Sequence, residues 1–178
     1  MLTAIVLANS QGKQGLARRV PEAAARTLAF LVSAAVRGLV RDAVLIGEDS
    51  AALSYVADYA GCTLVSEAEP AKALEAALAA ARGEHVFLLM AGYAAEPPLI
   101  DEIRDFVELG HGREGVCGLV REAPMGLVQR IVPATSPLAG LVAPRDKSRA
   151  AKARDLGDMA RRLRPKTTFA AVARRLIH

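Results

Sequence analysis

Two adjacent carboxylates, Glu48 and Asp49, directly follow an apolar run that is typical of a β-strand, DAVLI at Asp42–Ile46. Carboxylate oxygens at the carboxyl end of a strand could coordinate Mg²⁺ or Mn²⁺, or accept hydrogen bonds from a ribose or a base. Ser50 comes next, and Asp49 or Ser50 could instead cap a helix by accepting hydrogen bonds from its first free N–H groups. The two interpretations are compatible, and both remain open.

A second pair of carboxylates, Asp155 and Asp158, is spaced i and i+3 on one face of a predicted helix. From that position a carboxylate could act as a general base that deprotonates the hydroxyl of an acceptor. Alternatively, both are solvent-exposed acids that pair with nearby arginines, of which Arg154, Arg161 and Arg162 are close enough in sequence.

Other catalytic patterns are absent from the sequence. It has no Walker loop, no GxGxxG and no nucleophile elbow, and neither Cys62 nor Cys117 has metal-ligand spacing or a nearby histidine. The turn Ser10–Gly15 contains glycine between a predicted strand and a predicted helix, so its N–H groups could face a phosphate. A plain connecting loop is the alternative for this turn.

The elements that must position these residues alternate regularly up to Gly110. Apolar runs bounded by glycine and proline predict strands, and three- and four-residue apolar spacing predicts helices. The expected strands are Leu2–Ala8, Asp42–Ile46, Cys62–Val65 and Val86–Met90. The expected helices are Glu22–Val40, one capped by Ser50 and ended by Gly61, one from Pro70 ended by Gly83, and one from Pro97 to Gly110. This order predicts an α/β fold with a parallel sheet wrapped by helices.

Beyond Gly110 the pattern is weaker. Two strands are expected, at Gly115–Val120 and Leu127–Val132, with a turn near Met125–Gly126. Three prolines between Arg130 and Pro144 predict a loop with short extended pieces. A basic amphipathic helix is expected at Lys147–Leu163 and a short terminal one at Phe169–Ile177.

Composition narrows the class of protein. The 178 residues are 52% hydrophobic and 24% charged, which predicts one globular domain in a reducing, cytoplasmic compartment. The longest charge-free apolar run, Thr27–Val36, is about half of a membrane span. The net charge of +4 is uneven: Ala143–His178 holds eleven Lys or Arg and three Asp. Such basic helices could bind the acidic inner surface of the membrane. Alternatively, their charged side chains simply face solvent. Few aromatics and no Trp argue against nucleic acid.

Three stretches resemble a known family. LTAIVLAN (Leu2–Asn9), the segment Ala25–Val65 and AALAAARGEHVFLLMAG (Ala76–Gly92) resemble the N-terminal half of bacterial family 2 glycosyltransferases. The resemblance implies a single GT-A-like, Rossmann-like domain over 1–178, with a nucleotide-binding half at 1–110 and a degenerate acceptor-side half at 111–178. It also implies transfer of a sugar from a nucleotide-diphospho-sugar donor with the help of a divalent metal, Mg or Mn.

The resemblance implies roles for individual residues. Ala8, Asn9, Glu48, Asp49 and Gly92 fall at cofactor-binding positions, Asp49 is the remaining candidate metal ligand, and Asp155 or Asp158 falls at the catalytic base. The chain departs from the family at Gly92, which stands where the family has its metal-binding aspartate, and at Gly47, which stands at the family's first acid.

A second resemblance implies the same fold. AIVLANSQGKQG (Ala4–Gly15) is similar to the strand and glycine-rich loop of the nucleotidyltransferases that act on molybdenum cofactor, which also have an aspartate at the place of Gly92. Two function hypotheses therefore stand: a glycosyltransferase-like enzyme, and a catalytically inactive descendant that keeps the sheet as a binding or assembly module.

Overall fold

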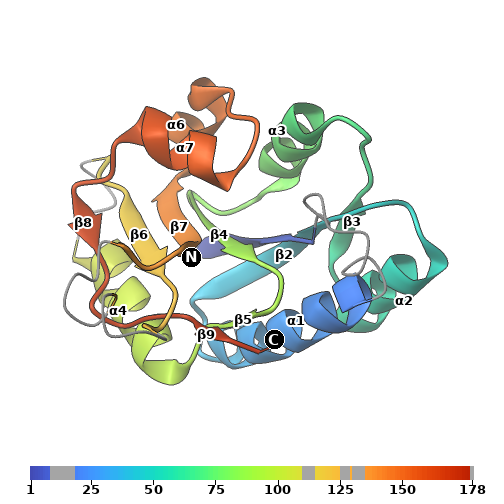
Figure 1. Ribbon diagram of the computed structural model, residues 1–178, viewed down its shortest axis with the longest axis horizontal. Coiled ribbons are helices and arrows are strands. Elements are labelled where there is room, and N and C mark those ends of the chain that lie inside the picture. The colour runs from blue at the N-terminus through green and yellow to red at the C-terminus, as the bar shows by residue number, and fades with distance from the viewer. Residues whose placement is uncertain (9–18, 110–114, 125–128, 130–134, 177–178) are drawn as a thin grey trace.

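The first half of the chain alternates strands and helices, as the sequence predicts (Figure 1). The computed structural model describes residues 1–8, 19–109, 115–124, 129 and 135–176. Strand β1 pairs in parallel with β2 and β4, and β2 pairs in parallel with β3. In chain order the elements are β1 (Leu2–Leu7), α1 (Val20–Val36), β2 (Val40–Ile46), α2 (Ala51–Ala60), β3 (Thr63–Val65), α3 (Pro70–Ala80) and β4 (His85–Met90).

The second half completes the sheet with an antiparallel strand. Its described elements are β5 (Tyr93–Ala94), α4 (Pro97–Glu108), β6 (Gly118–Arg121), β7 (Leu138–Pro144), α6 (Arg145–Ala151), α7 (Leu156–Leu163), β8 (Thr167–Thr168) and β9 (Arg174–Arg175). The main sheet has the order β3-β2-β1-β4-β7-β6-β8, and β7 runs antiparallel to both of its neighbours. The fold is thus a single α/β domain with a mainly parallel sheet, which confirms the predicted class.

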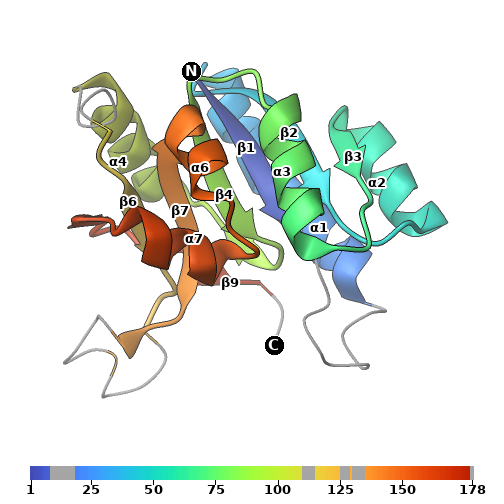
Figure 2. The ribbon, with the colours of Figure 1, turned by 90° about the horizontal axis from the view of Figure 1, so that it is seen from above.

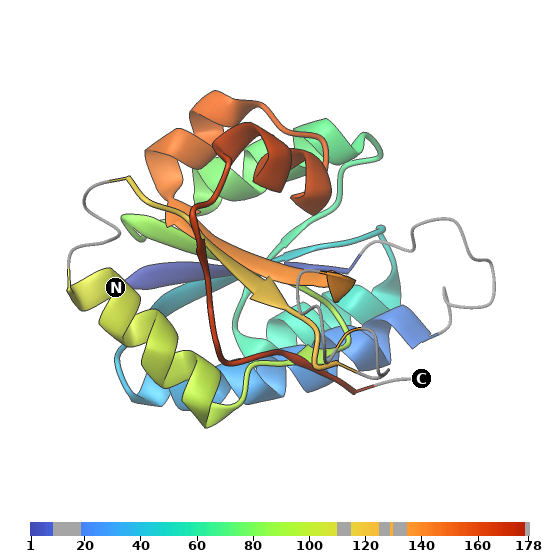
Figure 3. The same cartoon turned by 60° about the vertical axis from the view of Figure 1, so that its left-hand side comes forward.

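Helices cover both faces of the sheet. Figure 3 shows α1, α2 and α4 beneath it and α3, α6 and α7 above it, and Figure 2 shows α3, α6 and α7 from their own side. Successive strand residues point to opposite faces, so Ala4 and Val6 of β1 pack with the α1 and α4 side chains while Ile5 and Leu7 pack with those of α3 and α7. All six residues of β1 are buried, as expected for a strand covered on both faces.

The predicted ends of α2 are confirmed. The Ser50 hydroxyl accepts a hydrogen bond from the N–H of Leu53 at 3.3 Å, and Gly61 ends the helix in the left-handed region at φ 64°. Helix α1 ends at Val36, earlier than the predicted Val40, because Gly38 turns the chain at φ 75° and Val40 already belongs to β2.

Gly83 does not end α3, and the prediction that it does is wrong. The helix stops at Ala80 with Ala81 as its C-cap. Gly83 instead lies against the backbone of β1, where its N–H donates to the Thr3 Oγ1 at 2.8 Å. A Cβ on Gly83 would come within 2.6 Å of the Thr3 nitrogen and 2.7 Å of the Leu2 carbonyl carbon. Only glycine permits this approach, which sets β4 beside β1.

The loop predicted between Arg130 and Pro144 contains a central strand. Residues Leu138–Pro144 form β7, and its interior is buried between β4 and β6. Gly140 has a structural reason to lack a side chain, since a Cβ there would lie 2.7 Å from the Leu88 carbonyl oxygen. Pro137 precedes the strand and Pro144 is its last residue, so neither proline interrupts the ladder.

The single basic helix predicted at Lys147–Leu163 is two helices. Lys152 adopts a left-handed conformation at φ 46° after α6, and Asp155 then caps α7. The break turns the chain back on itself, so that α6 and α7 lie side by side over the sheet (Figure 2).

The terminal helix predicted at Phe169–Ile177 is also wrong. Residues 167–176, which we call the strap, are extended and pass beside the edge of the sheet from the α7 layer to the α1 layer (Figure 3). Glu102 of α4 holds the strap, because its carboxylate accepts hydrogen bonds from the Ala170 and Ala171 amides at 2.8 and 2.7 Å. Phe169 packs edge-on against Phe106 of α4.

The strand expected at Gly115–Val120 is confirmed as β6, with shifted ends. Other predictions fall on parts of the chain that the structure does not describe. The turn Ser10–Gly15 and the turn near Met125–Gly126 lie outside the described residues, as does the strand expected at Leu127–Val132 except for Gln129. Within the described ranges, the helices are all too short or too polar to cross a bilayer.

Candidate functional site

The strand order contains a topological switch point between β1 and β4. Helices α1 and α2 carry the chain from β1 to β2 and β3 along one face, and α3 then carries it back across the other face to β4. The strand ends are held together there, because the Ala91 N–H donates to the Leu7 carbonyl at 3.0 Å and the Ala8 N–H to the Ile46 carbonyl at 2.8 Å. Ligands of open α/β sheets bind outside the carboxyl ends of strands at such a point.

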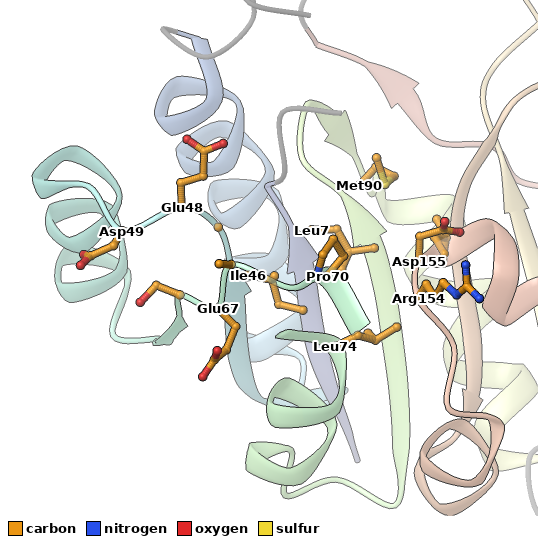
Figure 4. A pocket seen from close by; sticks show the side chains of 14 residues that line it. Leu7, Ile46, Glu48, Asp49, Glu67, Pro70, Leu74, Met90, Arg154 and Asp155 are labelled. Carbon is orange, nitrogen blue, oxygen red and sulfur yellow. The ribbon is translucent and has the colours of Figure 1, made fainter. Parts of the chain in front are cut away.

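A cavity of about 470 Å³ opens at this edge, on the α3 and α7 side of the sheet (Figure 4). This volume is within the range of small-molecule sites in proteins. Its floor is formed by the ends of β1, β2 and β4 at Leu7, Ile46 and Met90. The remaining lining residues come from the loops after β2 and β3, from α3 and from the start of α7: Gly47, Glu48, Asp49, Ser66, Glu67, Ala68, Pro70, Leu74, Arg154, Asp155 and Leu156.

Glu48 and Asp49 both line the cavity, where the turn after β2 places them. Gly47 in that turn packs closely against α2, since a Cβ on it would come within 2.7 Å of the Leu53 side chain. Because Ser50 supplies the helix cap, the Asp49 carboxylate does not have that task. Glu67, from the loop after β3, adds a third carboxylate. Sequence reasoning missed Glu67, although its position two residues after Val65 is the same strand-end signal.

The three carboxylates do not converge on one point. In Figure 4 the side chains of Glu48, Asp49 and Glu67 point in different directions. Among the residues that the structure describes, no group of three His, Cys, Asp or Glu side chains is placed to hold a metal ion. The described donor set therefore does not by itself fit Mg²⁺ or Mn²⁺, which take six or more oxygen ligands or keep several waters.

The pair Asp155 and Asp158 is divided by the structure. Asp155 lines the cavity and caps α7, because its Oδ1 accepts a hydrogen bond from the Asp158 N–H at 2.7 Å. Asp158 does not line it. Its carboxylate accepts the Arg154 N–H at 3.1 Å and pairs with Arg161 and Arg162. The hydrogen bond from the Arg154 backbone, followed by that from Arg162, lowers the pKa of Asp158. A lowered pKa makes Asp158 a weaker base, and Asp158 does not line the cavity. Asp155 is therefore the better candidate for a general base.

Gly92 faces away from the cavity. It is buried after β4 at φ 90°, and a Cβ on it would point toward Ala23 of α1 at 3.8 Å. Thr27 of α1 fixes the turn, because its hydroxyl accepts the Gly92 N–H at 2.9 Å and donates to the Tyr93 carbonyl at 3.0 Å. Ala8 is buried at the end of β1 beside Gly47 and is not a lining residue, and Asn9 lies outside the described residues.

Replacing Gly92 with alanine is expected to destabilise the protein by about 1 kcal/mol, because the left-handed region is strained for a residue with a Cβ. Steric contact contributes little, since the space toward Ala23 is adequate. Urea denaturation of the two proteins measures the difference. An unchanged free energy of unfolding would contradict the left-handed conformation at this position.

The strap closes the α1 side of the same strand ends. Strand β9 pairs with β5, and the Leu176 N–H donates to the Gly92 carbonyl at 2.7 Å. The Tyr93 hydroxyl donates to Glu122 at 2.9 Å, and the Arg175 guanidinium lies 2.7 Å from the same carboxylate oxygen and 3.0 Å from the Tyr93 hydroxyl. Burial, the largest cause, raises the pKa of Tyr93. We call these residues the Tyr93–Glu122–Arg175 cluster.

Several basic residues of the C-terminal segment pair with the protein's own acids. Arg174 pairs with Glu96 at 2.7 Å, Arg175 pairs with Glu122, and Arg161 and Arg162 share Asp158. These pairs reduce the positive charge that this segment presents to solvent. Binding of an acidic membrane surface stays a prediction.

Comparisons with known proteins give similarity of fold. No protein-family model matches the chain, and a search of curated proteins by sequence found no match. Among solved structures, 4-diphosphocytidyl-2C-methyl-D-erythritol synthase is similar, with a TM-score of 0.58 and 13% identity over 93% of this chain and 86% of that one.

Two further structures are similar over the whole chain. The 2-C-methyl-D-erythritol 4-phosphate cytidylyltransferase of Thermus thermophilus has a TM-score of 0.57 and 16% identity over 100% of this chain and 94% of that one. TarS 1–349 of S. aureus has a TM-score of 0.56 and 12% identity, and the match covers 100% of this chain and 59% of that one. The chain thus has the fold that these three proteins share.

Proposed function

We propose that the cavity binds the nucleotide part of a nucleotide-diphospho-sugar or a related nucleotide, and that the protein is a glycosyl- or nucleotidyltransferase-like enzyme. The observation that carries this proposal is the position of the cavity, at the β1/β4 switch point with Glu48 and Asp49 at the end of β2. The similar fold of a protein named as a cytidylyltransferase, and of one named as the synthase of a diphosphocytidyl compound, supports it.

The polar residues of the cavity suit the binding of the nucleotide and the activation of the acceptor. Carboxylates accept hydrogen bonds from ribose hydroxyls or from the N–H groups of a base, which is the role we assign to Glu48 and Asp49. Since these residues do not complete a metal site, the protein's own part is to hold the nucleotide.

Asp155 is the base in this proposal. Its carboxylate takes the proton of an acceptor hydroxyl, the hydroxyl oxygen forms a bond to the anomeric carbon of the donor sugar, and the bond from that carbon to the diphosphate breaks. The nucleoside diphosphate leaves with the electron pair. Asp155 reaches this position because it caps α7 at the rim of the cavity.

A non-catalytic nucleotide-binding or assembly module is the second candidate. It is favoured by Gly92, which supplies no side chain and whose missing Cβ is directed at α1. If the protein is instead similar in function to the nucleotidyltransferases that act on molybdenum cofactor, we propose that its nucleotide binds in the same cavity. Binding without turnover of any nucleotide-sugar would distinguish the module from the enzyme.

Calorimetry with UDP, GDP and CDP, with and without Mn²⁺, tests the proposal. We expect micromolar binding of at least one, and a loss of about tenfold in Asp49→Asn, since a hydrogen bond to a charged group contributes about 1.5 kcal/mol or more. Asp58→Asn is the matched control, because it removes the same charge from the exposed face of α2, outside the cavity lining. Absence of binding by all three nucleotides would overturn the proposal.

A further inference from the structure

The cation among the described lining residues lies opposite most of the cavity's carboxylates. Glu48, Asp49 and Glu67 lie on the side of β2 and β3, and Arg154 lies across the cavity on the side of α7, next to Asp155 (Figure 4). Among the described lining residues, Arg154 is the one that carries a positive charge. The cavity therefore has a cation at its α7 end and three of its four carboxylate residues at the other end.

Arg154 is held in place by its backbone, while its guanidinium is left for a ligand. The Arg154 N–H donates to Asp158, which fixes the residue directly before the cap of α7. The neighbouring acids are engaged elsewhere: Asp158 pairs with Arg161 and Arg162, and one Asp155 oxygen accepts the Asp158 N–H. In the part of the chain that the structure describes, no carboxylate lies within ion-pair distance of the Arg154 guanidinium.

The start of α7 does not substitute for this guanidinium. The Asp155 carboxylate caps the helix and places a negative charge at its N-terminus, so its free N–H groups are poorly suited to an anion. A guanidinium instead donates two parallel hydrogen bonds to a phosphate and keeps its charge at all physiological pH values.

We propose that Arg154 binds the phosphate end of the ligand and that the carboxylates bind its hydroxyl- or amine-bearing end, so that the cavity fixes the direction in which the ligand lies. The proposal rests on the proposed function for the nucleotide as ligand. The anion site at Arg154 itself needs only a phosphate or diphosphate group.

Inorganic pyrophosphate is the probe for the anion site. In an NMR titration at low ionic strength we expect the Arg154 side-chain resonance to shift, and Arg154→Gln to weaken pyrophosphate binding at least tenfold. Arg161→Gln is the matched control, because Arg161 is paired with Asp158, 77% exposed and outside the cavity lining, and it should leave the affinity unchanged. Equal effects of the two substitutions, or no binding of pyrophosphate, would overturn the proposal.

A nucleoside and its diphosphate test the direction of binding. Arg154→Gln should weaken UDP at least tenfold and leave uridine unchanged, whereas Glu67→Gln should weaken both by a similar factor. The reverse pattern would contradict the proposed direction. If pyrophosphate binds at Arg154 but no nucleotide binds, the anion site stands and the proposed function fails. If nucleotides bind and Arg154→Gln changes nothing, the proposed function stands and this inference fails.

Discussion

Gly83→Ala is expected to destabilise the protein by about 3 kcal/mol, because a Cβ there would collide with backbone and not with a side chain that can rotate away. The Cβ would lie 2.6 Å from the Thr3 nitrogen and 2.7 Å from the Leu2 carbonyl carbon. Relief requires the start of β4 to move away from β1, which breaks hydrogen bonds between these two central strands. For a chain of this size we expect a fall in Tm of about 6–12 °C.

Gly157→Ala is the matched control. Gly157 is exposed in the first turn of α7, where alanine is a better helix former, and a Cβ there would meet only the Asp155 Oδ1 at 3.3 Å. Its effect should stay within about 1 kcal/mol in either direction. Thermal denaturation by circular dichroism compares the two. Similar changes in Tm for both variants would contradict the close approach at Gly83.

Arg175→Leu is expected to cost about 2 kcal/mol of the free energy of unfolding. The substitution leaves the Glu122 carboxylate, of which 3% is exposed, without its cation and with the Tyr93 hydroxyl as its remaining donor in the Tyr93–Glu122–Arg175 cluster. Breaking a fully buried pair costs about 3–5 kcal/mol. The expected loss is smaller here because the Arg175 side chain is 41% exposed and water screens the interaction.

Two further variants separate the buried charge from simple loss of packing. Arg175→Leu combined with Glu122→Leu should be more stable than Arg175→Leu alone, since removing both charges leaves none uncompensated. Arg174→Leu is the control on the same strand, because neither side chain of the Arg174–Glu96 pair is buried (57% and 41% exposed), and its effect should stay within about 0.5 kcal/mol. Urea denaturation measures all three. A double variant less stable than Arg175→Leu would contradict the buried-charge explanation.

Local sequence signals predict the first half of the fold because local interactions determine it. Helix α2 begins after Ser50 and ends at Gly61 through contacts within one helical turn. The apolar runs of β1 and β4 are continuous because both faces of these strands are buried. The same logic locates Glu48 and Asp49, which follow β2 directly.

The elements that sequence reasoning misses depend on distant partners. Strand β7 contains small residues and ends in a proline, which favours a loop, but β4 and β6 pair with it on both sides. The strap is rich in alanine and arginine, which favours a helix. It is extended because Glu102 accepts two of its amides and Glu122 pairs with Arg175, contacts that span 68 and 53 residues.

The candidate site shows the same division. Glu67 follows the end of β3, which is a local signal, whereas Arg154 reaches the cavity only because α7 packs on the same face of the sheet as α3, which no local pattern specifies. For Gly92, resemblance correctly marks the end of β4, but its left-handed conformation and its contact with α1 become visible only in three dimensions.

The burial of β1 has a consequence for how the molecule opens. Its amide and carbonyl groups are hydrogen-bonded to β2 on one side and β4 on the other, so its amide hydrogens can exchange with water only when the whole sheet separates. Strands β8 and β9 are two residues long and largely exposed, so they can open in a sub-global fluctuation that leaves the rest folded. The strand ends that form the cavity floor therefore persist through every opening short of global unfolding.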